Sequence, residues 1–144
     1  MTTNLAEFND KFRVEELEIH RGAYWIWSLR PAQSTLAAGI LSLRRLSTAF
    51  GDVTKEEMAD LAAMISLIED RLAGTFKPAK INYLMLMMVD AHVHFHVLPR
   101  YPDPVIFAGH SWTDEGWPAL PGILNNPDFA DTAMLSTLRD TLKG

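Results

Sequence analysis

One stretch of the chain, His92 to Leu98, alternates histidine with large apolar residues. A period of two is the period of a β-strand, so His92, His94 and His96 are expected on one face, with the apolar residues between them facing the core. A buried imidazole needs hydrogen-bond partners that a leucine would not need, so three imidazoles in register are hard to explain as packing. The stretch therefore predicts a strand that carries a chemical site.

Metal binding and nucleophilic attack are the two functions that such a row could serve. Same-face Cα atoms on a strand lie roughly 6.8 Å apart, so the outer histidines, roughly 13 Å apart, converge poorly on one ion. The chain also has no cysteine to complete a zinc site. At neutral pH an imidazole is a good nucleophile and, when protonated, a good donor to phosphate. The pattern favours a row in which one histidine attacks and its neighbours hold the oxygens of a polyanion.

His92 to Arg100 resembles the signature of the histidine triad (HIT) superfamily, in which three histidines alternate with apolar residues and two apolar residues follow. Asn82 stands upstream at about the distance at which HIT proteins carry an asparagine that contacts phosphate or ribose. The resemblance covers roughly residues 14–101. It implies an α+β, HIT-like fold: a mostly antiparallel sheet of about five strands, a long helix packed on it, and extra terminal helices.

The resemblance also implies a nucleotide hydrolase that cleaves at the α-phosphate of a dinucleoside polyphosphate or a nucleoside phosphoramidate. His94 would be the nucleophile and would carry the nucleotidyl group as a covalent intermediate. His92 and His96 would assist catalysis and bind the nucleotide by donating to non-bridging oxygens or to the leaving group. Asn82 would position the phosphate or ribose. A purine nucleotide and a homodimer are implied, and no cofactor or metal is expected.

Two departures from the HIT pattern bear on the substrate. Many HIT proteins have a histidine near the end of the strand before the long helix, where this chain has Arg44-Arg45-Leu46-Ser47. Many also place a Gly-Gln pair just before the triad, where this chain has Asp90-Ala91. Asp90 would repel a phosphate unless it turns away or holds His92. A non-catalytic nucleotide-binding or adaptor homodimer is the alternative function, and a His-x-His metal site is a third.

Size and composition are those of an ordinary globular protein, with 144 residues, 48% hydrophobic and 22% charged. One domain, residues 1–144, is expected, with a core at about 14–101 and a Pro/Gly-rich tail at 102–144. The net charge of −5 argues against nucleic-acid and membrane-surface binding. The lack of cysteine and of a basic, apolar leader fits a cytoplasmic protein.

Local patterns predict the remaining elements. Leu5, Phe8 and Phe12 are spaced as in a short helix. Strands are expected at 14–19, 24–29, 35–43 and 81–88, the last so apolar that both its faces, and Asn82 within it, should be covered. Residues 89–91 would then form a tight connection to the histidine strand. Gly39 is expected to allow a close backbone approach.

The long helix is expected at residues 52–73, with a capping box at Thr54 and Glu57 and a stop at Gly74. Its apolar stripe would consist of Met58, Leu61, Ile65, Ile68 and Leu72. The tryptophans of 24–29 could form the wall of a base pocket or pack in the core. In the tail, Trp112 and Trp117 should hold the chain against an apolar surface, across the active site or the partner subunit, before a short helix at 128–143.

Overall fold

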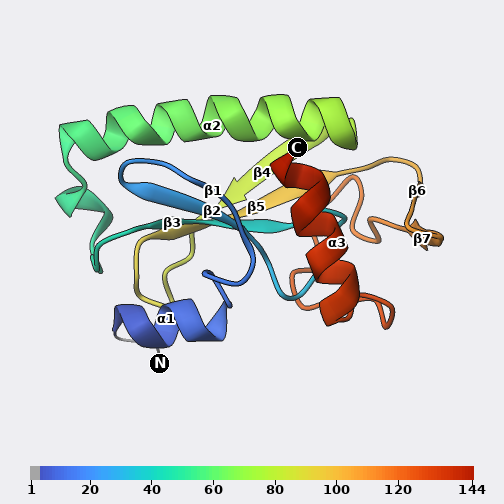
Figure 1. The fold of residues 1–144 in the computed structure, drawn as a ribbon, viewed down its shortest axis with the longest axis horizontal. Coiled ribbons are helices and arrows are strands. Elements are labelled where there is room, and N and C mark those ends of the chain that lie inside the picture. Colours follow the sequence, from blue (N-terminus) through green and yellow to red (C-terminus); the bar gives the residue numbers. More distant parts are fainter. Residues whose placement is uncertain (1–3) are drawn as a thin grey trace.

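A five-stranded antiparallel sheet lies at the centre of the computed structural model, which describes residues 4–144 (Figure 1). The strand order is β1-β2-β3-β5-β4. The strands are β1 (Glu18–Arg21), β2 (Trp25–Leu29), β3 (Gly39–Leu43), β4 (Lys80–Leu84) and β5 (His94–Arg100). With one long helix and a helix near each end of the chain, this architecture confirms the predicted α+β fold.

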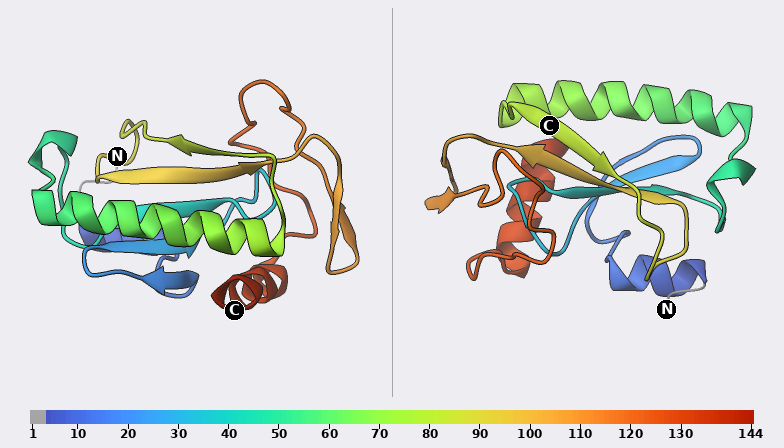
Figure 2. Two further views of the ribbon diagram at one scale, coloured as in Figure 1. Left: turned by 90° about the horizontal axis from the view of Figure 1, so that it is seen from above. Right: turned by 180° about the vertical axis from the view of Figure 1, so that it is seen from behind.

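The long helix α2 (Lys55–Thr75) crosses one face of the sheet (Figure 2). Its capping box is confirmed, because the Thr54 hydroxyl accepts from the Glu57 amide and the Glu57 carboxylate accepts from the Thr54 amide. The predicted stop at Gly74 is wrong, since the helix continues to Thr75. The chain turns at Lys77 instead, with φ of 53° and an amide that donates to the Leu72 carbonyl.

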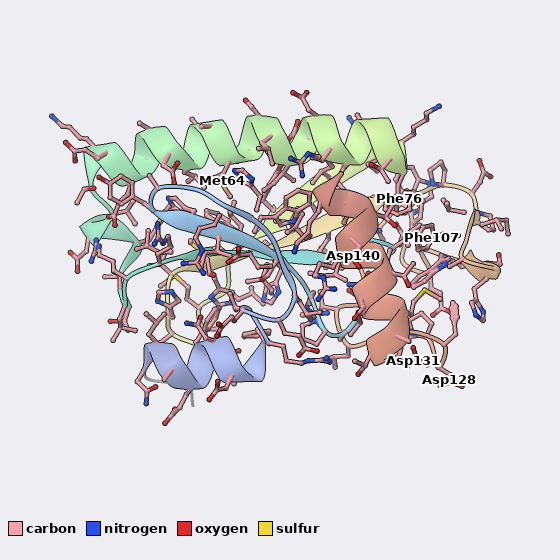
Figure 3. The ribbon with its side chains drawn as sticks, in the orientation of Figure 1. Met64, Phe76, Phe107, Asp128, Asp131 and Asp140 are labelled. Atoms are coloured by element: carbon pink, nitrogen blue, oxygen red, sulfur yellow. The ribbon has the colours of Figure 1, made fainter. Side chains whose placement is uncertain are left out.

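The buried stripe of α2 differs at one place from the expected stripe. Met58 is 45% exposed, and Met64 lies in the core in its place, on the side of the helix that faces the sheet (Figure 3). Trp25 and Trp27 belong to this same core, and the Trp25 indole donates to the Glu57 carbonyl at 2.8 Å. Both tryptophans therefore pack beneath α2 and do not form a wall of the histidine site.

Gly39 confirms the predicted close approach between strands. A Cβ at this position would lie 2.8 Å from the Trp27 indole nitrogen and 2.9 Å from the Ser28 carbonyl oxygen. No side chain fits there without moving backbone, so glycine lets β2 and β3 pair beside a large aromatic ring.

The sheet ends at β4, and the prediction for this segment is wrong. The strand covers only Lys80–Leu84, pairs with β5 alone, and is half-buried or exposed along its length. Residues 85–93 form a longer connection in which Met88 and Val89 are 71% and 61% exposed. Asn82 is exposed and not buried as predicted. An edge strand has a neighbour on one side only, so an apolar run at the edge can remain open to solvent.

Helix α1 (Leu5–Lys11) lies on the face of the sheet opposite α2 (Figure 1). It contributes to a second, smaller core formed by Phe8, Phe12, Val14, Ile26 and Ile40. The first strand begins at Glu18 and not near residue 14, because residues 12–17 form turns. The predicted strand at 35–43 is likewise shorter, beginning at Gly39.

After β5 the chain forms a hairpin of β6 (Val105–Phe107) and β7 (His110–Trp112), then turns, then α3 (Thr132–Lys143). The Phe107 ring contacts the Phe76 ring beyond α2, with centroids 5.1 Å apart, and Asp131 caps α3 (Figure 3). Trp112 is buried and Trp117 half-buried. A short 3-10 helix, η1 (Phe50–Asp52), precedes α2. No helix within residues 4–144 is long and apolar enough to cross a membrane.

Candidate active site

The three histidines lie together on the face of the sheet that α1 covers. His94 and His96 alternate along β5, opposite Ser42 and Ile40 of β3, and their rings are 5.1 Å apart between centroids. His92 precedes the strand, in a bend, and not within it as predicted. All three are buried, with exposed fractions of 1%, 2% and 8% in chain order.

The His94 ring is held in one tautomer. Its Nδ1 lies 2.5 Å from the carbonyl oxygen of His92. A carbonyl can only accept, so Nδ1 must carry the proton, and the neutral ring then has its lone pair on Nε2. Burial, the largest influence, lowers the pKa of His94 from its ordinary value of 6.5. A neutral imidazole with a free Nε2 lone pair is the form that attacks phosphorus.

The His92 ring is bound to backbone on both sides. Its Nε2 donates to the Leu43 carbonyl at 2.8 Å, and its Nδ1 accepts from the Ser47 amide at 3.3 Å. Its own carbonyl meanwhile accepts from His94. His92 thus connects the end of β3 to the nucleophile candidate. Donation from this ring to a phosphate is still a prediction, and it would require the ring to leave one of these partners.

The His96 ring differs from both because its buried Nδ1 has no hydrogen-bond partner among the described residues. Burial, His94 and Arg30, in that order of strength, lower the pKa of His96 to about 4. The ring is therefore neutral at physiological pH in this closed arrangement. An unpaired buried polar atom is uncommon in a folded protein, so His96 Nδ1 is a candidate for a ligand contact.

The depressed pKa of His96 should make stability depend on pH. Between pH 6.5 and about 4 the unfolded chain binds a proton at this position that the folded chain does not, so stability falls as the pH falls. Across this pH range the free energy of unfolding should change by about 3 kcal/mol through His96. Burial also lowers the pKa of His92 and His94, so denaturant unfolding of the wild type and of His96→Gln between pH 4 and 7 measures the His96 contribution as the difference between them. His110→Gln is the control, because His110 is exposed. An NMR titration that gives His96 a pKa near 6.5 would contradict this expectation.

Helix α1 and its C-cap residue cover the triad with two aromatic rings. The Phe8 centroid lies 4.9 Å from those of both His92 and His94, and the Phe12 centroid lies 6.0 Å from that of His94. Phe8 is fully buried. The predicted helix at the N-terminal end is thus present, but nothing in its spacing indicated that its apolar face would lie on the histidines.

Asp90 lies near the triad but is turned toward α1. Both of its carboxylate oxygens accept from the Lys11 ammonium, at 2.8 and 2.9 Å. This ion pair joins the segment before the triad to the last turn of the covering helix. Lys11 also compensates the negative charge of Asp90, which by itself would disfavour a phosphate at this site.

Asn82 shares the histidine face but stands apart from the triad. It pairs with Leu98, while Leu84 pairs with His96. Its Oδ1 accepts from Arg100 Nη1 at 2.8 Å. A groove of about 850 Å³ runs past it, lined by β4, Leu98, Arg100 and residues 117–121. No histidine of the triad lines this groove, but Leu84, the strand partner of His96, does.

Sequence reasoning missed several contacts that position these residues. The Ser47 amide holds His92, although the sequence marks Ser47 only as part of a departure from the HIT pattern. Arg100 closes the signature stretch, but its partner Asp114 lies in the tail and no pattern links the two. Backbone donors and long-range ion pairs leave no local periodicity, so no signal in one sequence could have revealed them.

Known proteins resemble this chain in sequence and in fold. Residues 39–103, which include all three histidines, match the family model of the HIT domain. No curated protein sequence matches the chain. Among solved structures, a histidine triad protein from Sinorhizobium meliloti superposes with a TM-score of 0.69 and 18% identity, covering 90% of each chain.

Two further solved structures come from other organisms. A hypothetical histidine triad nucleotide-binding protein from Sulfolobus tokodaii gives a TM-score of 0.65 at 12% identity, covering 88% of this chain and 80% of that one. A diadenosine triphosphate hydrolase from Plasmodium falciparum, in complex with cyclomarin A, gives 0.57 at 14% identity, covering 61% and 63%. At such identities the likeness shows a common fold.

Fold and site together define a histidine triad domain of the α+β class. Residues 39–103 match the HIT domain family, and the chain has the fold of solved histidine triad proteins.

Proposed function

We propose that this protein is a nucleotide-binding hydrolase that cleaves at the α-phosphate of a dinucleoside polyphosphate or nucleoside phosphoramidate. The observation that carries the proposal is the His94 ring, whose Nδ1 is bound to the His92 carbonyl and whose Nε2 is left as the nucleophile. The family match and the likeness to the Plasmodium diadenosine triphosphate hydrolase support the same class of reaction.

In the proposed reaction, His94 Nε2 attacks the α-phosphorus as the bond to the leaving group breaks. The new Nε2–P bond gives a nucleotidyl-histidine whose ring keeps its Nδ1 proton, and the leaving group takes up a proton from solvent, which the attacking water returns in the second step. Water then attacks the phosphorus, releases the nucleoside monophosphate and regenerates the neutral ring. In this proposal the neutral His96 ring carries its proton on Nε2 and donates it in a hydrogen bond to a non-bridging oxygen.

Substrate must displace α1 before His94 can attack, because Phe8 and Phe12 lie over the triad. The helix has only seven residues, and an exposed ammonium, that of Lys11, forms its ion pair with Asp90. Opening this cover breaks a part-buried ion pair and exposes the buried rings of Phe8 and Phe12. Exposing two such rings costs about 3–6 kcal/mol, which substrate binding must offset.

A turnover assay with a dinucleoside polyphosphate and a nucleoside phosphoramidate tests the proposal. Purified protein should release nucleoside monophosphate from at least one of them, equally with and without EDTA. Binding without turnover would favour the alternative, a non-catalytic nucleotide-binding or adaptor protein. Turnover that EDTA abolishes would favour a metal site instead.

Asn82 is proposed to bind the phosphate or ribose, since it lies in the groove beside the triad. Asn82→Ala should weaken AMP binding by about tenfold, the value of one hydrogen bond to a charged group. The melting temperature should fall only slightly, because Asn82 is exposed and Arg100, which loses one partner, keeps its bonds to Asp114 and Ala119. Calorimetric titration and thermal melting measure the two effects, with exposed Asn125→Ala as the control. An unchanged affinity together with a lowered melting temperature would assign Asn82 to the fold.

A homodimer is proposed as well, as is usual for the family. The outer edge of β4 has no strand partner within residues 4–144, and the neighbouring Leu86, Met88, Val89 and Leu120 are exposed. Pairing of two such edges would satisfy backbone groups and cover apolar surface. Sedimentation equilibrium tests this, and a monomer at micromolar concentration would contradict it. A cytoplasmic location is proposed from the cysteine-free sequence.

A further inference from the structure

Arg30 is a buried cation without an anion. It follows β2 directly, is 9% exposed, and forms no ion pair within residues 4–144. Its Nη1 donates to the carbonyls of Ala32 and Ile123 and to the Ser34 hydroxyl, at 2.8 to 3.3 Å. Its Nε is buried without a partner among these residues. Carbonyls and a hydroxyl solvate a guanidinium only in part, so burying its charge carries a free-energy cost.

Two other arginines of the chain show what Arg30 lacks, which is either a carboxylate partner or contact with solvent. Arg100, which is 4% exposed, binds the Asp114 carboxylate through two nitrogens. Arg44 also binds only carbonyls, but it is exposed to solvent, which compensates its charge. Arg30 is buried like Arg100, but like Arg44 it has only uncharged partners. An anion that binds from outside the chain could compensate the charge of this guanidinium.

Two further unpaired polar atoms lie on the same face of the sheet. Ser28 Oγ and His96 Nδ1 are both buried and without a partner in the part of the chain that the structure describes. Ser28 pairs with Ile40 of β3, and Ile40 pairs with His96 of β5, so the three residues form one row across the sheet. The Arg30 amide continues the β2–β3 ladder by donating to the Ala38 carbonyl, which places Arg30 one same-face position beyond Ser28.

The charge of Arg30 reaches the triad. It is one of the causes that lower the pKa of His96, after burial and His94. A phosphate placed between the guanidinium and the imidazole would reverse this effect, because its negative charge favours the protonated ring. The incoming anion would thus satisfy the guanidinium and turn His96 into a stronger donor.

We propose that Arg30, Ser28 and His96 form a binding site for a phosphate group beside the nucleophile. The inference rests on the proposed function insofar as that phosphate belongs to the nucleotide that His94 attacks. A guanidinium offers paired N–H donors that match the oxygens of a phosphate, a hydroxyl can donate a further bond, and the imidazole can donate once protonated. Arg30 is thereby a substrate-binding residue that the triad pattern does not include.

Inorganic phosphate is the first probe, because it needs no turnover. Phosphate should raise the melting temperature of the wild-type protein and shift the NMR signal of the Arg30 Nε–H group, but not that of Arg44. In Arg30→Met the affinity for phosphate should fall by about tenfold or more, as expected for loss of a charge-assisted pair. Without phosphate this variant should melt no lower than the wild type, since an uncompensated buried charge has been removed.

Arg44→Met is the matched control, because it removes a guanidinium that also binds only carbonyls. It should bind phosphate like the wild type. Ser28→Ala, a smaller change, should weaken phosphate binding without unfolding the protein, which keeps the test valid if Arg30→Met folds poorly. Phosphate binding that is equal in the wild type, Arg30→Met and Ser28→Ala would overturn the proposal. So would an unshifted Arg30 signal at saturating phosphate.

AMP as a second probe separates this inference from the proposed function. If the protein fails to hydrolyse nucleotides but Arg30→Met still weakens binding of phosphate and AMP, the hydrolase proposal falls and the phosphate site stands. If nucleotides are hydrolysed and Arg30→Met leaves both KM and AMP affinity unchanged, the hydrolase proposal stands and the phosphate site is overturned.

Discussion

His94→Asn should abolish nucleotide hydrolysis while leaving the domain folded. The asparagine amide can still donate to the His92 carbonyl, as Nδ1 does now, but it offers no lone pair to attack phosphorus. Loss of a covalent route removes several kcal/mol of transition-state stabilisation, which corresponds to a fall in kcat of about a thousandfold or more. Single-turnover kinetics and mass spectrometry of the acid-quenched protein measure the rate and the nucleotidyl adduct.

The choice of asparagine follows from the burial of His94. From the sequence, a residue on an open strand face should tolerate alanine without loss of stability. In the structure the ring lies beneath Phe8 and is 2% exposed, so alanine would leave a cavity and an unpaired carbonyl. Exposed His110→Asn is the control and should retain wild-type turnover. An adduct and a near-normal rate in His94→Asn would show that another residue attacks.

Features with a local cause were predictable from the sequence. Alternation of histidines with apolar residues defined the strand and its face, although the strand begins at His94 and not at His92. The Thr54–Glu57 capping box depends on two residues three apart in the sequence, so a local pattern is enough to predict it. The close backbone approach at Gly39 was predictable, because glycine inside an apolar strand often marks such an approach.

Features that depend on tertiary neighbours were not predictable. The apolar run after Ile81 looked like a strand with both faces covered, since hydrophobicity does not report whether a strand lies at the centre or the edge of a sheet. Phe8 and Phe12 had the spacing of a helix, but no pattern states what an amphipathic face will cover. The charge of Arg30 became informative only once its burial and its lack of a carboxylate partner within residues 4–144 were visible.

For the candidate site, the face that His94 and His96 share was predictable, whereas the hydrogen-bond partners of the rings were not. His94 and His96 share the expected face, and the role of His94 as the attacking ring stays a prediction that the tautomer supports. The His92 ring is bound to the backbone of Leu43 and Ser47, contacts that depend on how two distant segments meet. Sequence spacing fixes which residues can be neighbours on a strand, whereas hydrogen-bond partners from other strands are fixed by the fold.

The ion pair that holds the tail on the sheet is expected to have the largest effect on stability. Arg100 and Asp114 side chains are 5% and 1% exposed, and Nε donates to the carboxylate at 2.7 Å. The same carboxylate accepts from the Tyr101 amide at 3.1 Å, and the guanidinium also donates to the Ala119 carbonyl. Residues 114–119 are therefore tied to the end of β5 by one buried network, which also forms part of the groove beside Asn82.

Asp114→Ala should lower the free energy of unfolding by about 3–5 kcal/mol, because it leaves the buried Arg100 charge without a carboxylate and the Tyr101 amide without an acceptor. The melting temperature should fall by on the order of 10 °C in a domain of this size. The double variant Arg100→Met, Asp114→Leu should recover much of the loss, since it removes both charges and fills the space. Asp140→Ala, which removes the exposed partner of Arg139, is the control and should melt like the wild type. If Asp114→Ala also melts like the wild type, the buried pair does not secure the tail, and the groove beside the triad must be held by the apolar contacts of residues 117–121 alone.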